Sequence, residues 1–165
     1  MTDTEYLKLA ISIGYLNIDK FRNKHVGCVI VKDDRIISVG FRTMIPSYMG
    51  YKYACYHSEA LALKAIESLD VTNATIFCTT EPCSYRIVDD PRLYPSLPCV
   101  DYIIQSRKIN RVVYAKSESW VGDGGARLLN AAGISTEIIP LEVPFVQDVI
   151  PEEFKELIEP FLEKK

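Results

Sequence analysis

The sequence predicts an α/β fold, a three-layer α/β/α sandwich built around a central mixed sheet of five strands. Two β-rich runs, residues 26–31 and 36–41, lie close together near the start of the chain. Segments with helical and strand periods then alternate as far as about residue 139. A hairpin followed by alternating helices and strands puts antiparallel and parallel strands into one sheet, with helices on both of its faces.

The individual elements can be placed in order along the chain. Thr2 and Glu5 have the spacing of a capping box, and apolar residues follow at helical spacing at Tyr6, Leu9, Ala10, Ile13 and Leu16. Lys32–Arg35 is the expected turn between strands Val26–Val31 and Ile36–Phe41. The pattern then predicts helix Ser58–Leu69, strand Ala74–Thr79, helix Val100–Arg107, strand Arg111–Ala115, helix Asp123–Ala132 and strand Thr136–Ile139. Gly133 stands where a glycine commonly ends a helix.

Three segments fall outside this alternation. Arg42–Tyr56 and Ser84–Pro98 match no regular element, and we expect long functional loops there. From Pro151 an acidic segment with an apolar stripe predicts a helical extension over about residues 151–163, which would serve as core or dimer interface. Because no repeat or linker divides the chain, residues 1–165 are expected to form one domain with a core over about residues 4–139.

Composition narrows the class of protein. The 165 residues are 48% hydrophobic and 25% charged, which is typical of a globular domain. The net charge of −3 argues against a general nucleic-acid binder, since such proteins need a basic excess to neutralise phosphates. No apolar run approaches the length of a membrane span, and the polar, acidic start does not have the pattern of an export signal. With five cysteines and no such signal, we expect a cytoplasmic protein.

Three short runs carry residues of a zinc site: His57-Ser58-Glu59, Glu81-Pro82-Cys83 and Pro98-Cys99. A catalytic zinc ion commonly takes three imidazole or thiolate ligands and keeps one position for water. His57 and Cys99 stand at predicted helix starts, where the helix dipole favours a thiolate. We therefore expect Zn²⁺ bound by His57, Cys83 and Cys99, with Glu59 beside it as the catalytic acid and base.

The known pattern for zinc deaminases is His-x-Glu followed by Pro-Cys-x-x-Cys, with the glutamate outside the ligand set. Here fifteen residues, 84–98, separate the two cysteines instead of two. The second Pro-Cys pair indicates a loop inserted into the motif with the helix start retained. Two other interpretations stay open: Cys55 could complete a structural zinc site with four ligands, and Gly122–Gly125 could bind phosphate or form a plain tight turn.

On these residues the chain resembles the cytidine-deaminase superfamily over about residues 4–139. Asn23–Val29, Thr80–Ser84 and Val121–Gly125 are similar to motifs of the pyrimidine deaminase domain of riboflavin biosynthesis. Lys32–Gly40 and Arg111–Tyr114 are similar to deoxycytidylate deaminase. Both branches usually have alanine between the histidine and the glutamate, where this chain has Ser58.

The resemblance implies a zinc-dependent hydrolytic deaminase of a small nucleobase-containing substrate. A pyrimidine nucleotide or a diaminopyrimidine ribosyl phosphate is preferred over a nucleic acid or a purine, and a non-catalytic zinc-binding module is the alternative outside the enzymes. It also implies substrate contacts by Asn23, Arg42, the backbone N–H of Ser58 and the carbonyl of Pro82. We expect no membrane or nucleic-acid partner. We do expect the chain to form a homo-oligomer of two or more copies.

Overall fold

The computed structural model describes residues 1–16, 26–46, 53–84, 93–94, 97–117 and 124–142. Its elements follow the chain in the order α1 (Asp3–Gly14), β1 (Gly27–Lys32), β2 (Arg35–Phe41), β3 (Thr43–Pro46), β4 (Tyr53–Tyr56), α2 (Ser58–Ala65), β5 (Ala74–Thr80), β6 (Leu93–Tyr94), α3 (Cys99–Ser106), β7 (Ile109–Lys116), α4 (Gly125–Ala131) and β8 (Ser135–Ile138).

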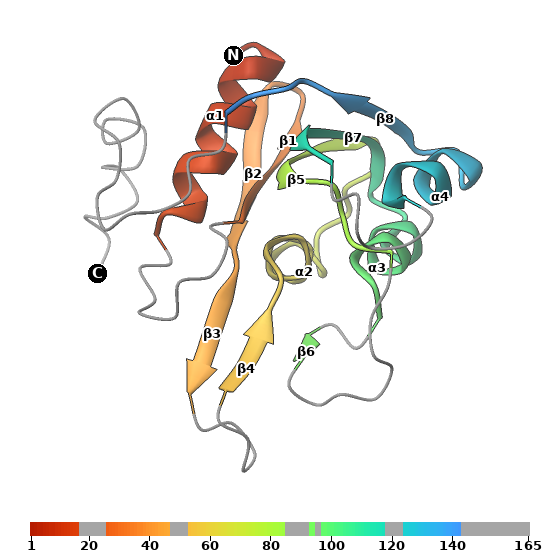
Figure 1. The fold of residues 1–165 in the computed structure, drawn as a ribbon. Coiled ribbons are helices and arrows are strands. Elements are labelled where there is room, and N and C mark those ends of the chain that lie inside the picture. Colours follow the sequence, from red (N-terminus) through yellow and green to blue (C-terminus); the bar gives the residue numbers. More distant parts are fainter. Residues whose placement is uncertain (17–25, 47–52, 85–92, 95–96, 118–123, 143–165) are drawn as a thin grey trace.

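The main sheet has five strands in the order β2-β1-β5-β7-β8. β1 pairs antiparallel with both β2 and β5, whereas β5, β7 and β8 run parallel. α1 covers one face of this sheet, and α2 and α3 lie on the other (Figure 1). The predicted three-layer α/β/α sandwich with a mixed five-stranded sheet is therefore confirmed.

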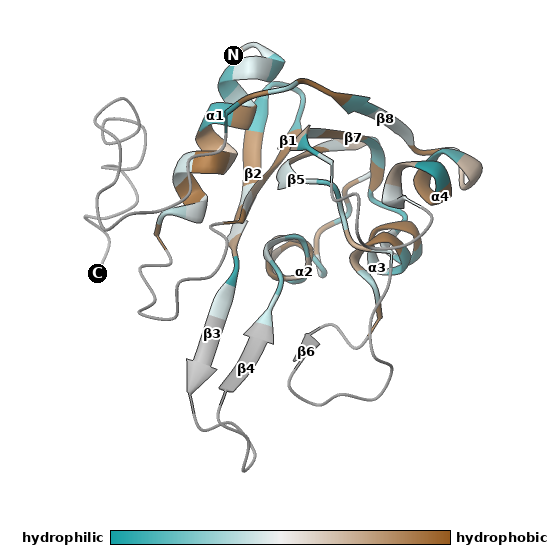
Figure 2. Ribbon diagram, in the orientation of Figure 1, coloured by the Kyte–Doolittle hydropathy of each residue, from teal (hydrophilic) through white to brown (hydrophobic). Residues whose placement is uncertain are grey.

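Alternate residues of the central strands supply two separate apolar layers. On β1, Cys28 and Ile30 pack toward α2 and α3, while Val29 and Val31 pack toward α1. This two-residue alternation is expected of a strand covered on both sides. In Figure 2, hydrophilic residues mark the start of α1 and hydrophobic residues its middle turns. The apolar stripe predicted for this helix is accordingly its buried face.

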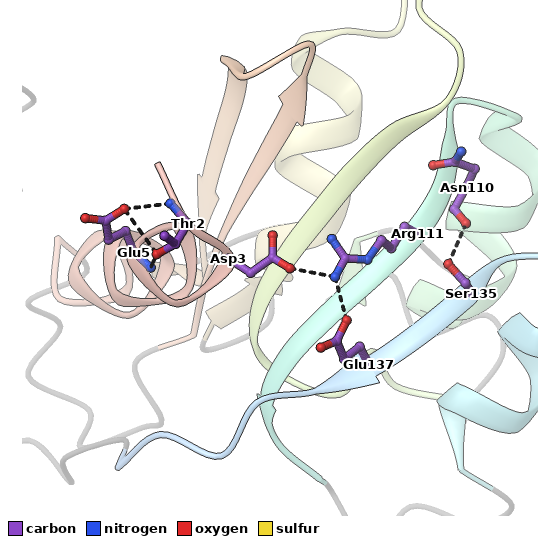
Figure 3. Close-up of polar contacts among 7 residues, drawn as sticks. All are labelled: Thr2, Asp3, Glu5, Asn110, Arg111, Ser135 and Glu137. Carbon is purple, nitrogen blue, oxygen red and sulfur yellow. Dashed lines mark hydrogen bonds and ion pairs between the residues drawn. The ribbon is translucent and has the colours of Figure 1, made fainter.

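The N-terminal end of α1 is fixed by side chains from its own first turn and from the sheet (Figure 3). The predicted capping box is present: the N–H of Glu5 donates to Thr2 Oγ1 at 3.3 Å, and the N–H of Thr2 donates to Glu5 Oε2 at 2.6 Å. Arg111 of β7 donates to Asp3 at 2.6 Å and to Glu137 of β8 at 2.5 Å. One guanidinium thus ties the start of α1 to two strands.

The turn between β1 and β2 also agrees with the sequence. Asp33 and Asp34 have φ values of 48° and 57°, the left-handed region that a type I′ hairpin turn requires at both central positions. Aspartate tolerates this conformation better than most residues. Gly133, with φ at +82°, follows α4 as predicted.

The prediction of an irregular loop over Arg42–Tyr56 is wrong. β3 and β4 pair antiparallel in this segment, and β6, from the predicted loop Ser84–Pro98, adds in parallel to β4. The three strands form a second small sheet in the order β3-β4-β6 (Figure 1). Thr43, Ile45 and Tyr53 are of strand-forming types, but runs this short become strands only through their pairing.

Other differences concern the ends of elements. α2 ends at Ala65 rather than Leu69, because the next N–H groups turn back to carbonyls three residues earlier and Leu69 is exposed. The predicted extension over residues 151–163 and the start of the predicted helix at Asp123 lie outside the described residues. In the described ranges, no helix has both the length and the apolar character needed to cross a bilayer.

Candidate metal centre

Three side chains of metal-binding type converge at the N-terminal ends of α2 and α3. His57 precedes α2, Cys99 is the first residue of α3, and Cys83 follows the end of β5 by three residues. Their ligand atoms all lie within 4.8 Å of one another. His57 Nδ1 stands 3.7 Å from the sulfur of Cys83 and 3.3 Å from that of Cys99. The imidazole therefore faces both thiols through one nitrogen.

This arrangement fits a zinc ion. Tetrahedral zinc with ordinary Zn–S and Zn–N bonds holds its sulfur and nitrogen ligands about 3.6 Å apart. The two sulfur–nitrogen separations lie on either side of that value. One imidazole and two thiolates are also a donor set that zinc uses in catalytic sites, where water takes the remaining position.

The start of α3 prepares the thiolate of Cys83. The N–H of Cys99 donates to the sulfur of Cys83 at 3.3 Å, and the N–H of Val100 donates to its carbonyl at 3.2 Å. The pKa of Cys83 falls to about 3, chiefly through the side-chain hydrogen bond from Cys99. A hydrogen bond with His57 and the charge of that residue lower the pKa further, although burial opposes the shift. A thiolate suitable for binding a metal is thus favoured at neutral pH.

Glu59 lies in the first turn of α2 with only 3% of its surface exposed. The strands beneath fix this turn. Cys28 of β1 donates to the carbonyl of Ser58 at 3.3 Å, and Ser38 of β2 donates to the carbonyl of Ala62 at 2.7 Å. A Cβ added at Gly40 would stand 2.1 Å from the Ser58 carbonyl oxygen, so glycine lets β2 approach α2 closely. The carboxylate is therefore carried on an anchored piece of backbone.

Two further cysteines lie below this turn as directly paired neighbours, Cys28 on β1 and Cys78 on β5. Burial raises the pKa of both thiols well above the ordinary value, and the charge of Glu59 adds to this effect. Both stay protonated at neutral pH, which allows Cys28 to donate its hydrogen bond. Both side chains are fully buried, while the side chain of Cys55 lies outside the described part of the molecule.

Glu81 is a buried anchor that the sequence reasoning missed. Its Oε1 accepts from the backbone N–H of Ala126 at 2.8 Å, and its Oε2 accepts from the hydroxyl of Ser117 at 2.6 Å. Its own N–H donates to the carbonyl of Lys116 at 2.8 Å. These bonds fix the end of β5 just before Cys83. The Glu-Pro-Cys run marked the position, but no local pattern links Glu81 to a helix 45 residues away.

The structure describes three of the four residues expected to contact substrate. Ser58 is fully buried at the start of α2, and Pro82 is buried next to Cys83. The Pro82 carbonyl packs so closely against Gly125 that a Cβ there would stand 2.1 Å from it. Arg42 follows β2, where its N–H donates to the carbonyl of Val26 at 2.8 Å. Asn23 lies outside the described residues, and all four substrate contacts stay predictions.

Comparison with known proteins places this geometry in a family. The model for the cytidine and deoxycytidylate deaminase zinc-binding region matches residues 1–116. The riboflavin biosynthesis protein RibD of Aquifex aeolicus is 31% identical, over 96% of this chain and 38% of its own length. The diaminohydroxyphosphoribosylamino-pyrimidine deaminase of Buchnera aphidicola is 29% identical over 84% of both chains.

A solved structure agrees with these relatives. RibD of Acinetobacter baumannii superposes with a TM-score of 0.61 and 30% identity, covering 82% of this chain and 34% of that one. The chain spans about a third of the length of the RibD proteins it matches. The family model covers 116 of the 165 residues and includes His57, Glu59, Cys83 and Cys99. The chain therefore belongs to the cytidine and deoxycytidylate deaminase zinc-binding family.

Proposed function

We propose that this chain is a zinc-dependent hydrolytic deaminase of a small pyrimidine substrate. The observation that carries the proposal is the position of Glu59, which is buried two residues after His57 in the first turn of the same helix. A structural zinc site needs no such carboxylate, whereas hydrolytic deamination needs a group that moves protons next to the metal. In this proposal the imidazole and the two thiolates bind the metal, and Glu59 transfers protons.

In this proposal His57, Cys83 and Cys99 hold the zinc ion. When bound, zinc supplies a nucleophile at neutral pH by lowering the pKa of water to about 7. Glu59 accepts the proton that the attacking water loses and passes it to the ring nitrogen. It then takes the remaining proton from the oxygen that attacked and delivers it to the exocyclic amine, which leaves as ammonia while that oxygen stays on the ring as a carbonyl. One carboxylate performs both transfers because they occur in sequence.

The preferred substrate is a pyrimidine nucleotide or a diaminopyrimidine ribosyl phosphate. The name of the Buchnera relative, which this chain covers over 84% of its length, supports the second of these. The net charge of −3 favours a small substrate over a polynucleotide, which would need several Lys or Arg contacts along its strand. Asn23, Arg42, the Ser58 N–H and the Pro82 carbonyl remain the proposed contacts.

Three broader expectations belong to the same proposal. Residues 1–165 form a single domain, the chain assembles as a homo-oligomer of two or more copies, and it works in the cytoplasm. The apolar stripe after Pro151, expected from the sequence to be core or dimer interface, is the segment that we propose to test for a part in assembly. Light scattering of the full chain beside a version truncated after residue 142 tests that assignment. An unchanged mass would remove the extension from the interface.

The deciding experiment measures ammonia release from a panel of substrates. Free cytosine, cytidine, deoxycytidylate and a diaminopyrimidine ribosyl phosphate are compared with single-stranded DNA and transfer RNA, using the zinc-loaded protein. We expect turnover with at least one phosphorylated pyrimidine and none with either polymer. Turnover on a polymer alone would show that the chain is a nucleic-acid deaminase. No turnover on any substrate would favour a non-catalytic zinc module.

A further inference from the structure

The side chain of Ser58 contacts Glu59 in an unusual way. Its hydroxyl donates to Glu59 Oε2 at 2.8 Å, and the bond is buried, with Ser58 fully enclosed. Neighbouring residues on a helix normally point in different directions and do not meet. Here both side chains turn to the same point in the first turn of α2. This contact links the residue that replaces the usual alanine to the carboxylate proposed to move protons.

We propose that Ser58 is a positioning residue for the carboxylate of Glu59. The inference rests on the proposed function, since it assigns a second part of the same site. An ionised carboxylate only accepts hydrogen bonds, so the serine hydroxyl must donate its single hydrogen to Oε2. This bond fixes the rotation of the carboxylate about its terminal carbon. Oε1, on the far side of that carbon, is then the oxygen that accepts and delivers protons.

The backbone of Ser58 is held firmly enough for such a role. Its carbonyl accepts from the thiol of Cys28 at 3.3 Å, and Gly40 packs directly against the same oxygen. β1 and β2 thus fix the backbone from which the hydroxyl projects. A group that positions another must itself be fixed, because precise placement is lost when the supporting residues can move.

A purely structural role explains the hydroxyl less well. Serine near a helix start usually caps the helix by accepting from a backbone N–H. His57, not Ser58, is the N-cap residue of α2, and its side chain makes no cap bond. The hydroxyl bond goes to the Glu59 side chain instead. The contact therefore serves the carboxylate and not the helix terminus.

The first test compares Ser58→Ala with a matched control, Ser38→Ala. Ser38 also donates a buried hydrogen bond to α2, but to the carbonyl of Ala62 and away from Glu59. Ser58→Ala should fold and keep its zinc, and its kcat should fall about 10-fold with KM changed less than about 2-fold, because the carboxylate loses its alignment. Ser38→Ala should lower thermal stability and lower kcat by less than about 2-fold, because its bond holds α2 at Ala62, three residues beyond Glu59, and not the carboxylate itself. A raised KM with unchanged kcat in Ser58→Ala would overturn the proposal.

A double-mutant cycle shows whether Ser58 acts through Glu59. In a Glu59→Gln background, adding Ser58→Ala should change the residual kcat by less than about 2-fold, because the carboxylate to be aligned is gone. An equal fold-loss in both backgrounds would show that Ser58 affects turnover independently of Glu59. That result would overturn the positioning role while the deaminase assignment stood.

A crystal structure of Ser58→Ala separates this inference from the proposed function. We expect the Glu59 carboxylate to rotate or to occupy more than one orientation, whether or not any substrate is turned over. A carboxylate unmoved from its wild-type position would overturn the positioning role. Failure of the wild-type protein in the substrate panel, by contrast, would overturn the deaminase proposal and with it the catalytic purpose of the contact.

Discussion

The two faces of the main sheet use buried polar groups differently. On the α1 face, Ser12 bonds to Lys8 within its own helix, and Thr79 bonds to both backbone groups of Gly27 on the adjacent strand at 3.1 Å. Tyr6 of α1 donates to the carbonyl of Asp34 in the β1–β2 turn at 3.2 Å, and large apolar side chains such as Leu7, Ile11 and Phe77 fill the layer. This face holds the fold together, and among the residues that the structure describes it carries neither Glu59 nor any of the three metal-binding side chains.

On the opposite face, polar bonds tie three helices to strands or to the segment after β5. Cys28 and Ser38 reach from strands to α2, Glu81 reaches from just after β5 to α4, and the N–H of Cys99 reaches from α3 to Cys83. A buried polar bond is costly when one partner is missing, so such bonds fix positions more strictly than apolar contacts do. The difference shows that one face supplies mainly stability, while the other combines a packed core with bonds that fix the geometry of the site.

The largest expected effect comes from removing a metal donor on the polar face. Cys99→Ala leaves two of the three donors, and we expect the protein to lose its zinc and its turnover together. Elemental analysis and ammonia release measure the two losses. The matched control is Cys78→Ala, since Cys78 is buried on the same face but lies outside the donor group. Full zinc and full activity in Cys99→Ala would break the proposed metal centre.

The next largest effect separates chemistry from metal binding. Glu59→Gln should lower kcat by about 10²- to 10⁴-fold, the usual contribution of a general acid and base. Zinc content should stay near one ion per chain, because Glu59 is outside the donor group. Steady-state kinetics beside elemental analysis gives both numbers. A near-native kcat would remove Glu59 from the mechanism.

A matched pair of glycine substitutions tests the two faces directly. A Cβ at Gly27 would stand 2.1 Å from the Ala10 carbonyl oxygen in α1, and a Cβ at Gly40 would stand 2.1 Å from the Ser58 carbonyl oxygen in α2. Both clashes are with backbone, so each alanine variant should lose about 1–3 kcal/mol of unfolding free energy. Denaturant titration measures that loss.

The two variants should differ in function. Gly40→Ala displaces the helix start that carries Glu59, so we expect a lower kcat for its folded fraction and weaker zinc retention. Gly27→Ala displaces α1, and its folded fraction should turn over like the wild type. Equal losses of kcat in both variants would show that the two faces do not act separately.

The same contrast explains what the sequence could and could not predict. Capping, turn and alternation signals are local, and they correctly predicted α1, the β1–β2 turn at Asp33-Asp34 and the five strands of the main sheet. The convergence of His57, Cys83 and Cys99 was also predictable, because His57 and Cys99 stand at helix starts and Cys83 follows a buried strand in a Pro-Cys motif. Each of these features has a pattern within a few residues.

The anchors of the site have no such pattern. Cys28 meets the carbonyl of Ser58 across 30 residues, and Glu81 meets Ala126 across 45. The small sheet β3-β4-β6 depends equally on pairing between distant short runs. Their partners are chosen by the tertiary arrangement, which overrides weak local preference. For this reason, the sequence pointed to the candidate site residues but not to the residues that hold them in place.

The smallest expected effect comes from the surface link on the stabilising side. Arg111 bridges Asp3 and Glu137, and all three side chains are partly exposed. Arg111→Ala should therefore cost only about 0.2–1 kcal/mol of unfolding free energy, the usual value for exposed ion pairs. Part of this loss of unfolding free energy should vanish at about 1 M salt, where screening acts within about 3 Å.

Arg111→Lys is the matched control, because it keeps the charge but loses the planar guanidinium that contacts two carboxylates. Zinc content and kcat should not change in either variant, since the link fixes α1 and two strands but none of the site residues. A fall in kcat would mean that the start of α1 affects the metal centre through the sheet, and the separation of the two faces would then fail.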